Sequence, residues 1–333
     1  MNLEVQNKLL ANIKSNISDG ISFVDELADV LNISRDSAYR RIRGETLLNI
    51  VEIETLTKHY NLSLDSIIHS NRNKYSFDSK SIDLKNFTIT NYLTSIVENL
   101  SLLSHFEHYK IIYSGRDIPI FHYFAVPEIG KFKIFCWLKT YLNDPELKHR
   151  NFDLDNLPDS VEEAYQVGNK VWHKYLHLPS TEIWTSETVI ITLKQFNYYL
   201  DAGLFATPFL SDFLMEKFID LLLHIQKEVE LGSKFNLNST ALHEEASYDL
   251  YYNEVAQGDN SVLFHLGEKK IAFITYCTLN YLSTSNEHVC NIIDNYFNNL
   301  IKTSLLLSRT SEKQRNKFFN ILINMVKTYP NKL

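Results

Sequence analysis

The feature that most constrains the fold of this chain is a pair of short helical patterns joined by a sharp turn near the N-terminus. Apolar residues at helical spacing predict a first helix over residues 23–31, in which Ala28 is small enough to let a second helix cross at close range. Asn32 follows, and asparagine tolerates the left-handed backbone conformation of such a turn better than most residues do. Ser34 is a typical N-cap, so it predicts that the second helix covers residues 35–43.

Further helical patterns complete a small domain over residues 1–70. Gly44 is typical of the position that follows a helix end. Apolar spacing predicts two more helices, over residues 50–60 and 63–68. We therefore expect an all-α N-terminal domain whose apolar side chains share one core.

Positive charge is concentrated on the second helix, which carries four arginines within nine residues. Arginine can pair bidentately with guanine and can neutralise a phosphate, so this helix is suited to bind DNA. Residues 1–75 hold 9 Lys and Arg against 10 Asp and Glu, so the positive field must come from one face. A solvated basic helix in a protein-interaction bundle is the alternative. The four arginines are Arg35, Arg40, Arg41 and Arg43.

The order of these residues resembles the phage-repressor/Cro superfamily of five-helix, helix-turn-helix (XRE-like) DNA-binding domains, over residues 1 to about 70. The likeness is carried by Leu-Ala-x-x-Leu-x-Ile-Ser-Arg at 27–35, Arg-x-Arg-Gly-Glu at 41–45 and Leu-Ser-Leu-Asp-x-Ile-Ile at 62–68. Two positions depart from the family. Asn32 replaces the usual glycine, and Ile42 stands where the family often has a carboxylate in a buried salt bridge.

The resemblance implies that the second helix enters the major groove of double-stranded DNA and that its first turn reads base edges. Carried over residue by residue, it places three side chains against bases: Arg35, Asp36 and Arg40. It places four more against phosphates or flanking bases: Ser34, Ser37, Tyr39 and Arg43.

The length of 333 residues suggests a second domain. A content of 44% hydrophobic and 22% charged residues is ordinary for a globular protein, and a net charge of −7 argues against general nucleic-acid coating or membrane-surface binding. The three cysteines are widely spaced in apolar stretches, which favours reduced thiols. Because no signal peptide and no apolar run of the ~18 residues needed to span a bilayer are visible, we expect a cytoplasmic protein without a membrane partner.

A polar linker over residues 71–85 is predicted to lead into a sensor or dimerisation domain over 86–333. Its strand-like runs are 109–113, 118–124, 248–255, 261–266 and 270–279, with turns at 114–117, 257–260 and 267–269. Its helical patterns are 90–105, 127–141, 160–176, 186–202, 209–231, 284–307 and 311–329.

This order of helix, two strands, helices, three-strand meander and long helix is similar to that of PAS and GAF-like sensors, in which a five-stranded antiparallel sheet forms one wall of a ligand pocket. The helices inserted over residues 126–231 are longer than a simple PAS domain carries. The expected fold class is therefore α+β: an all-α five-helix domain, then a mostly helical domain with a small antiparallel sheet in PAS/GAF-like order. A helical domain with an unrelated small sheet is the alternative.

Sequence motifs for catalysis are absent: we find no Gly-rich phosphate loop, nucleophile elbow, His-Glu-x-x-His or Cys-x-x-Cys. We therefore expect no catalytic residue, metal or cofactor. His173 and His177 share a helical face among aromatic neighbours, which favours a structural role, and the acidic stretch 243–245 favours a solvated loop. Aromatic runs favour core packing, although some can line a ligand pocket: 121–124, 196–199 and 248–252.

These patterns predict a sequence-specific DNA-binding transcriptional regulator, not an enzyme, whose C-terminal domain senses a small-molecule or peptide effector or dimerises. The broad apolar face of residues 284–307 favours a homodimer, with intramolecular packing as the alternative. A second interpretation keeps DNA binding but makes residues 86–333 a helical peptide- or protein-binding module. The third, an enzyme with an appended DNA-binding domain, lacks a supporting motif.

Overall fold

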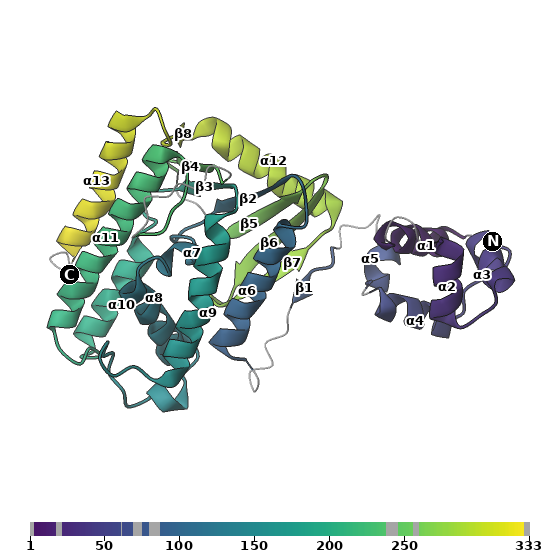
Figure 1. Cartoon of the computed structure of the whole chain (residues 1–333), viewed down its shortest axis with the longest axis horizontal. Coiled ribbons are helices and arrows are strands. Elements are labelled where there is room, and N and C mark those ends of the chain that lie inside the picture. Colours follow the sequence, from purple (N-terminus) through teal and green to yellow (C-terminus); the bar gives the residue numbers. More distant parts are fainter. Residues whose placement is uncertain are drawn as a thin grey trace. The chain divides into compact units, whose positions relative to one another are not determined.

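In a computed structural model of the chain, the structure describes residues 3–17, 22–60, 62–68, 75–79, 87–237, 246–255 and 260–329. The chain divides into two compact units, Met1–Phe77 (unit 1) and Asp78–Leu333 (unit 2), both drawn in Figure 1. The division falls within the segment 71–85. Residues 71–74 and 80–85 of that segment, 257–259 of the predicted turn and the stretch 243–245 lie outside the described residues.

Unit 1 is helical in its described part. Its helices are α1 (Glu4–Asn16), α2 (Phe23–Leu31), α3 (Arg35–Ile42), α4 (Ile50–His59) and α5 (Leu64–Ile68). One apolar cluster joins them: Leu9, Leu10, Ile13, Leu27, Ala28, Ala38, Leu48, Leu56 and Ile67. The apolar spacing of the sequence therefore reflects a shared core, as expected of amphipathic helices.

Unit 2 is built on a mixed sheet that has eight strands in the described part of the chain, in the order β1-β7-β6-β5-β2-β3-β4-β8. The pairs β2–β3 and β3–β4 are parallel, and the other neighbouring pairs are antiparallel. The strands are β1 (Asp78–Ser79), β2 (Tyr109–Ser114), β3 (Ser180–Trp184), β4 (Tyr248–Tyr252), β5 (Ser261–Leu266), β6 (Lys269–Tyr276), β7 (Asn280–Thr284) and β8 (Leu305–Leu306).

Helices cover both faces of this sheet. They are α6 (Ile89–Leu103), α7 (Ile120–Tyr123), α8 (Pro127–Cys136), α9 (Asp159–Leu176), α10 (Ile190–Asp201), α11 (Phe209–Leu231), α12 (Glu287–Thr303) and α13 (Glu312–Thr328). A π-helical segment, η1 (Trp137–Tyr141), continues α8, and a short 3-10 helix, η2 (Pro145–Leu147), follows it. The chain is therefore α+β, as the sequence predicts.

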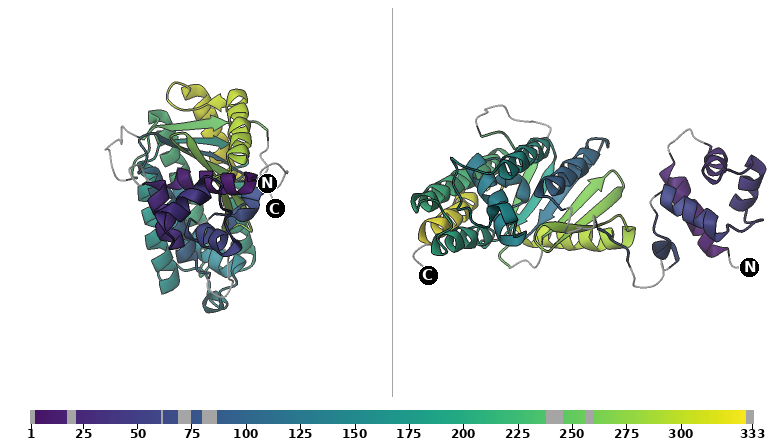
Figure 2. Two further views of the ribbon diagram at one scale, coloured as in Figure 1. Left: turned by 90° about the vertical axis from the view of Figure 1, so that its right-hand side faces the viewer. Right: turned by 90° about the horizontal axis from the view of Figure 1, so that it is seen from below.

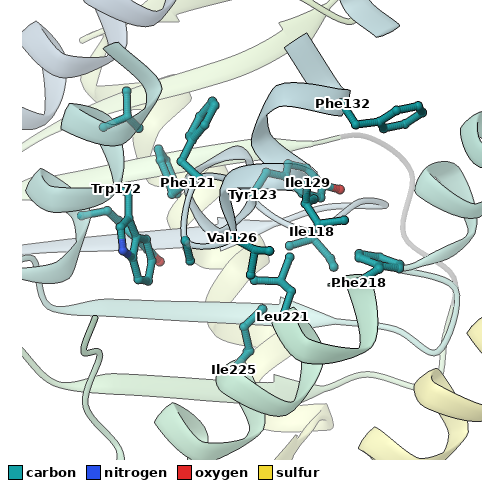
Figure 3. Close-up of a cluster of buried hydrophobic side chains, with 14 of the residues drawn as sticks. Ile118, Phe121, Tyr123, Val126, Ile129, Phe132, Trp172, Phe218, Leu221 and Ile225 are labelled. Carbon is teal, nitrogen blue, oxygen red and sulfur yellow. The ribbon is translucent and has the colours of Figure 1, made fainter. Parts of the chain in front are cut away.

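Alternate residues of β2 show how the two faces differ. Ile111 and Tyr113 point into the main core, which contains side chains of α6 to α11 and α13. Ile112 points to the other face, where it meets Cys290 and Phe297 of α12. Figure 2 accordingly shows α6 and α12 on opposite sides of the sheet. The main core is dense in aromatic rings, and Figure 3 shows part of it, with Trp172 of α9 and Phe218 of α11 near the α7–α8 segment.

The prediction of a strand over residues 118–124 is wrong. Ile120–Tyr123 form the short helix α7, and Pro119 occupies its N-cap position. A continuous apolar run buried on all sides has no period, so it does not distinguish a strand from a buried helix. The sequence missed β3 for a different reason: its five residues are all buried, but Ser180, Thr181 and Glu182 are polar, so they form neither an apolar run nor an alternating pattern.

The predicted small antiparallel sheet also needs correction. β4 does not pair with β5; it lies parallel to β3 and antiparallel to β8. The meander consists instead of β5, β6 and β7, because the run predicted over 270–279 turns at Cys277 and Thr278. The sheet is thus mixed rather than antiparallel, since crossovers through α7–α9 and through α10–α11 add parallel strands.

The long helix predicted over 284–307 ends earlier, at Thr303, and residues 305–306 form β8. Its apolar residues divide between two sides: Val289, Cys290 and Phe297 are buried, while Ile292 and Tyr296 are 53% and 50% exposed. Part of the broad apolar face is therefore intramolecular core. No helix in the described ranges combines the length and apolar character that crossing a membrane requires.

Candidate DNA-binding surface and ligand cavity

The α2–α3 segment of unit 1 has the local geometry that its sequence predicts. Asn32 adopts a left-handed conformation with φ of 51°, and the backbone N–H of Ile33 donates to the carbonyl of Ala28 at 3.0 Å. Ser34 caps α3 by accepting a hydrogen bond from the N–H of Ser37 at 3.2 Å. Gly44 follows the helix with φ of 75°, a conformation that favours glycine. These local contacts hold α2 and α3 at close range.

Most of the predicted DNA-contacting side chains lie on the exposed side or at the ends of α3. Six are exposed and Ser37 is half-buried; the exposed ones are Ser34, Arg35, Asp36, Tyr39, Arg40 and Arg43. Ala38 faces the core on the opposite side of the helix. The structure therefore brings the predicted residues together on one accessible surface, which we call the α3 surface.

Each arginine of the α3 surface has an acidic neighbour. The Arg35 guanidinium lies 2.6 Å from Asp25 of α2. Arg40 and Arg43 lie 3.9 Å and 3.6 Å from Glu45. Arg43 also stacks over the Tyr39 ring, and its pKa is raised mainly by the hydrogen bond to the Tyr39 hydroxyl. Exposed pairs of this kind are worth ~0–1 kcal/mol, so phosphates can compete for these arginines.

Arg41 differs from the other three arginines, so three rather than four arginine charges are exposed on the α3 surface. Its guanidinium points inward and pairs with Glu52 of α4, with a shortest N···O distance of 2.6 Å. It also donates to the backbone carbonyl of Ser37 at 3.0 Å. Burial by itself raises the pKa of Glu52, but the Arg41 hydrogen bond and the N–H of Asn49 outweigh burial and hold that pKa below its usual value. Arg41 therefore joins α3 to α4.

Unit 2 contains a cavity of about 370 Å³ between one face of the sheet and the helices that cover it. Strands β2, β5, β6 and β7 form one wall through side chains such as Tyr113 and Phe273. α6 supplies Tyr92, and η1 supplies Trp137 and Tyr141. The volume is in the range of small-molecule sites, and π-helical segments such as η1 recur at functional sites.

The cavity lies at the C-terminal end of β2. At this strand the sheet changes from parallel to antiparallel pairing. β2 has the parallel strand β3 on one side and the antiparallel strand β5 on the other. Ligands of open α/β sheets bind beyond the carboxyl ends of strands at such switch points. The loop after β2 is fixed there, because the N–H of Arg116 donates to the Asn260 side-chain oxygen at 2.8 Å.

Asp117 and Gln195 form the polar end of the cavity, and the buried Lys133 contacts both of them without lining the cavity itself. The Lys133 ammonium, which is buried, donates to Gln195 at 2.9 Å and to Thr192 at 3.1 Å, and lies 3.5 Å from Asp117. The Tyr123 hydroxyl donates to Asp117 at 2.6 Å. This group was not predicted from the sequence. The signal was a single lysine within the apolar run from Phe132 to Trp137.

A second buried network surrounds Glu182 of β3, away from the cavity. Its carboxylate accepts hydrogen bonds from His122, Tyr175, Trp184 and Tyr248. Burial raises the pKa of Glu182, but His122 and the hydrogen bonds outweigh burial and keep that pKa below its ordinary value. All five side chains are buried, so this network joins α7, α9 and two strands and offers no access to a substrate.

The aromatic runs therefore have different roles. Phe121 and Tyr123 line the cavity, whereas Tyr248 belongs to the Glu182 network and Phe196 and Tyr199 are buried core. His173 of α9 and His177, which directly follows that helix, are both exposed. Within the described ranges, no three His, Cys, Asp or Glu side chains are grouped in a way that could hold a metal ion.

Comparisons of the chain with protein-family models, with curated proteins and with solved structures found no match.

Proposed function

We propose that this chain is a sequence-specific, DNA-binding transcriptional regulator whose second unit senses a ligand. The observation that carries the proposal is the α3 surface, where Arg35, Arg40 and Arg43 are exposed on a capped helix beside a left-handed turn. This arrangement supports the resemblance of unit 1 to phage-repressor/Cro helix-turn-helix domains. In that resemblance α3 enters the major groove, and its first turn reads bases.

The cavity supports the sensing role of unit 2. As in PAS and GAF domains, one face of a sheet lines a cavity whose other walls come from helices, although the sheet here is mixed. A partly enclosed cavity of about 370 Å³ suits a small molecule, whereas peptides are recognised in open grooves or along exposed strand edges. The sheet also counts against the alternative of an all-helical peptide- or protein-binding module.

A route from the cavity to unit 1 runs through β1, the first element after the division at Phe77. β1 pairs with β7, and the Ser79 hydroxyl is hydrogen-bonded to that of Tyr276 at 2.8 Å. The turn that follows Tyr276 lines the cavity with Thr278, whose φ of 63° is strained for a β-branched residue. A ligand that changes this turn would move β1 and the chain leading to unit 1.

Substitutions on the α3 surface test DNA binding in the full chain. On genomic fragments enriched by the wild type, Arg40→Ala is expected to cost ~1–3 kcal/mol and to relax base preference, whereas Arg43→Ala weakens all sequences alike. Lys58→Ala, which removes an exposed charge from α4, is the matched control and should change affinity less than about twofold. Unchanged binding by an Arg35→Ala/Arg40→Ala variant would refute the proposed DNA-binding surface.

Homodimerisation is part of this proposal, because two half-sites one helical turn apart supply the affinity that one small domain lacks. The outward residues of α12, Ile292 and Tyr296, support an interface there. Light scattering on the full chain should give a dimer mass, and Ile292→Glu with Tyr296→Glu should give a monomer. A wild type that is monomeric at tens of micromolar, about the range in which weak interfaces are visible, contradicts this part of the proposal.

A further inference from the structure

We propose that the cavity of unit 2 binds an uncharged, mainly apolar ring compound that carries a hydrogen-bond acceptor such as a ring ketone. This proposal names the ligand class and rests on the proposed sensing function only for its regulatory consequence. Three properties of the cavity lead to it: its aromatic walls, its unpaired hydrogen-bond donors and its internally balanced charge.

The walls favour a flat, apolar ligand. Aromatic rings come from α6, from the segment that includes α7, from η1 and from the sheet, so they enclose the space from several sides. Rings of this kind bury large areas and favour stacked or edge-to-face contacts with another ring. The rings that the argument uses are Tyr92, Phe121, Trp137, Phe264 and Phe273.

Two buried phenols lack a partner. Tyr92 and Tyr113 line the cavity and are only 9% and 5% exposed, yet neither hydroxyl forms a hydrogen bond within the described part of the chain. Buried tyrosine hydroxyls are usually paired, so these two are available to a ligand. Burial raises the pKa of both phenols, and nearby groups such as Asp117 raise that of Tyr113 further. Both therefore stay protonated and can donate to an acceptor.

The charges at the polar end already balance each other. Lys133 is held by Asp117, Gln195 and Thr192, so its ammonium does not need an anionic ligand. The same carboxylate accepts from Tyr123, so it does not need a cationic one. A charged ligand would lose its hydration without gaining a partner. Arg116 lines only a neighbouring hollow, not the cavity itself.

The experiment uses the full chain and three matched probes: xanthone, xanthene, which lacks the ketone, and xanthone-2-carboxylate, which adds a charge. Equilibrium dialysis measures their affinities, and thermal unfolding followed by tryptophan fluorescence shows whether binding stabilises unit 2. We expect xanthone to bind about tenfold more tightly than either relative. Equal or tighter binding of the carboxylate, or no binding by any probe, overturns the ligand class.

Tyr92→Phe and Tyr113→Phe locate the site, because each removes one oxygen that no other described group uses. Each should weaken xanthone about threefold to tenfold, as the loss of one hydrogen bond does, and leave xanthene unchanged. Tyr165→Phe removes a phenol oxygen outside the cavity and is the matched control. Unchanged xanthone affinity in both cavity variants overturns the assignment of the donors.

A separate measurement of operator affinity with and without xanthone distinguishes the two proposals. Binding without any change in operator affinity leaves the ligand class standing and contradicts the sensing function.

Discussion

The contrast between Arg41 and Arg40 gives the sharpest test of unit 1, because neighbouring arginines on α3 have opposite roles. The Arg41 side chain is 15% exposed and the Glu52 side chain is 12% exposed. The Arg41 guanidinium donates to both carboxylate oxygens of Glu52. The Arg40 side chain is 57% exposed and lies 3.9 Å from Glu45. We expect Arg41→Met to destabilise unit 1, and Arg40→Met to weaken DNA binding without destabilising it.

The magnitude follows from burial. Removing one partner of a fully buried pair costs ~3–5 kcal/mol, because the other charge stays in a poor solvent. Glu52 keeps some solvent contact, so we expect ~2–3 kcal/mol for Arg41→Met and under about 0.5 kcal/mol for Arg40→Met. In a domain of this size, each kcal/mol shifts the melting temperature by about 4–8 °C. The Arg41→Met transition should therefore fall by about 10–20 °C.

The tryptophans make the assay specific to each unit. All three, Trp137, Trp172 and Trp184, lie in unit 2, so tryptophan fluorescence follows unit 2, whereas circular dichroism at the helix band follows both units. Thermal unfolding of the full chain should show an earlier dichroism transition for Arg41→Met and an unchanged fluorescence transition. Electrophoretic mobility-shift assays at temperatures below both unfolding transitions then measure DNA binding by the folded protein.

A second variant checks the electrostatic reason. Glu52→Gln removes the charge and keeps an oxygen that can accept from the N–H of Asn49, the N-cap residue of α4. Added to Arg41→Met, it should restore about half of the lost stability, because no unpaired charge remains. If Arg41→Met keeps the wild-type transition and loses DNA binding, the structural role of Arg41 is wrong and the residue belongs to the DNA-binding surface.

Three further predictions concern unit 2. Gly115→Ala would place a Cβ 2.3 Å from the Asn260 side-chain oxygen, so it should cost ~1–3 kcal/mol in urea unfolding and reduce xanthone binding; a wild-type midpoint contradicts this. Burial lowers the pKa of Lys234 to about 8, so above that pH Lys234 is mostly deprotonated in the folded state but still protonated in the unfolded state. The free energy of unfolding therefore rises with pH. Lys234→Met should remove this rise between pH 8 and about 9.5, as urea titrations followed by fluorescence can show. Ser79→Ala should leave xanthone affinity intact but reduce the effect of xanthone on operator affinity, and an unchanged effect would rule out the bond to Tyr276 as a link.

Local geometry in unit 1 could be predicted from the sequence. The positive φ of Asn32, the cap at Ser34 and the end of α3 before Gly44 depend on side chains within a few residues of one another. The exposed positions of Arg35 and Arg40 follow from the same helical period. The individual residues of the α3 surface were predicted from the resemblance to phage-repressor/Cro domains, and its binding to DNA remains a proposal.

Elements buried on every side escaped prediction because burial removes the alternation that sequence patterns rely on. Thr181, Glu182 and Ile183 show no period in β3, since both faces of this central strand are covered. The segment 120–123 was predicted as a strand but is helical, because its apolar run has no period that distinguishes the two structures. The missed strand explains why the sheet was expected to be small and antiparallel.

The sequence by itself determined the two-part organisation of helical and mixed patterns, the α+β class and the arginine-bearing helix. Only the tertiary structure decided that Arg41 pairs with Glu52, that Lys133 meets Asp117, and that Tyr92 and Tyr113 share a cavity. Helix periods, caps and turns depend on neighbouring residues, so they can be inferred from a linear pattern. Charge pairs and cavities depend on side chains from elements far apart in the chain, whose approach is set by the packing of the whole unit.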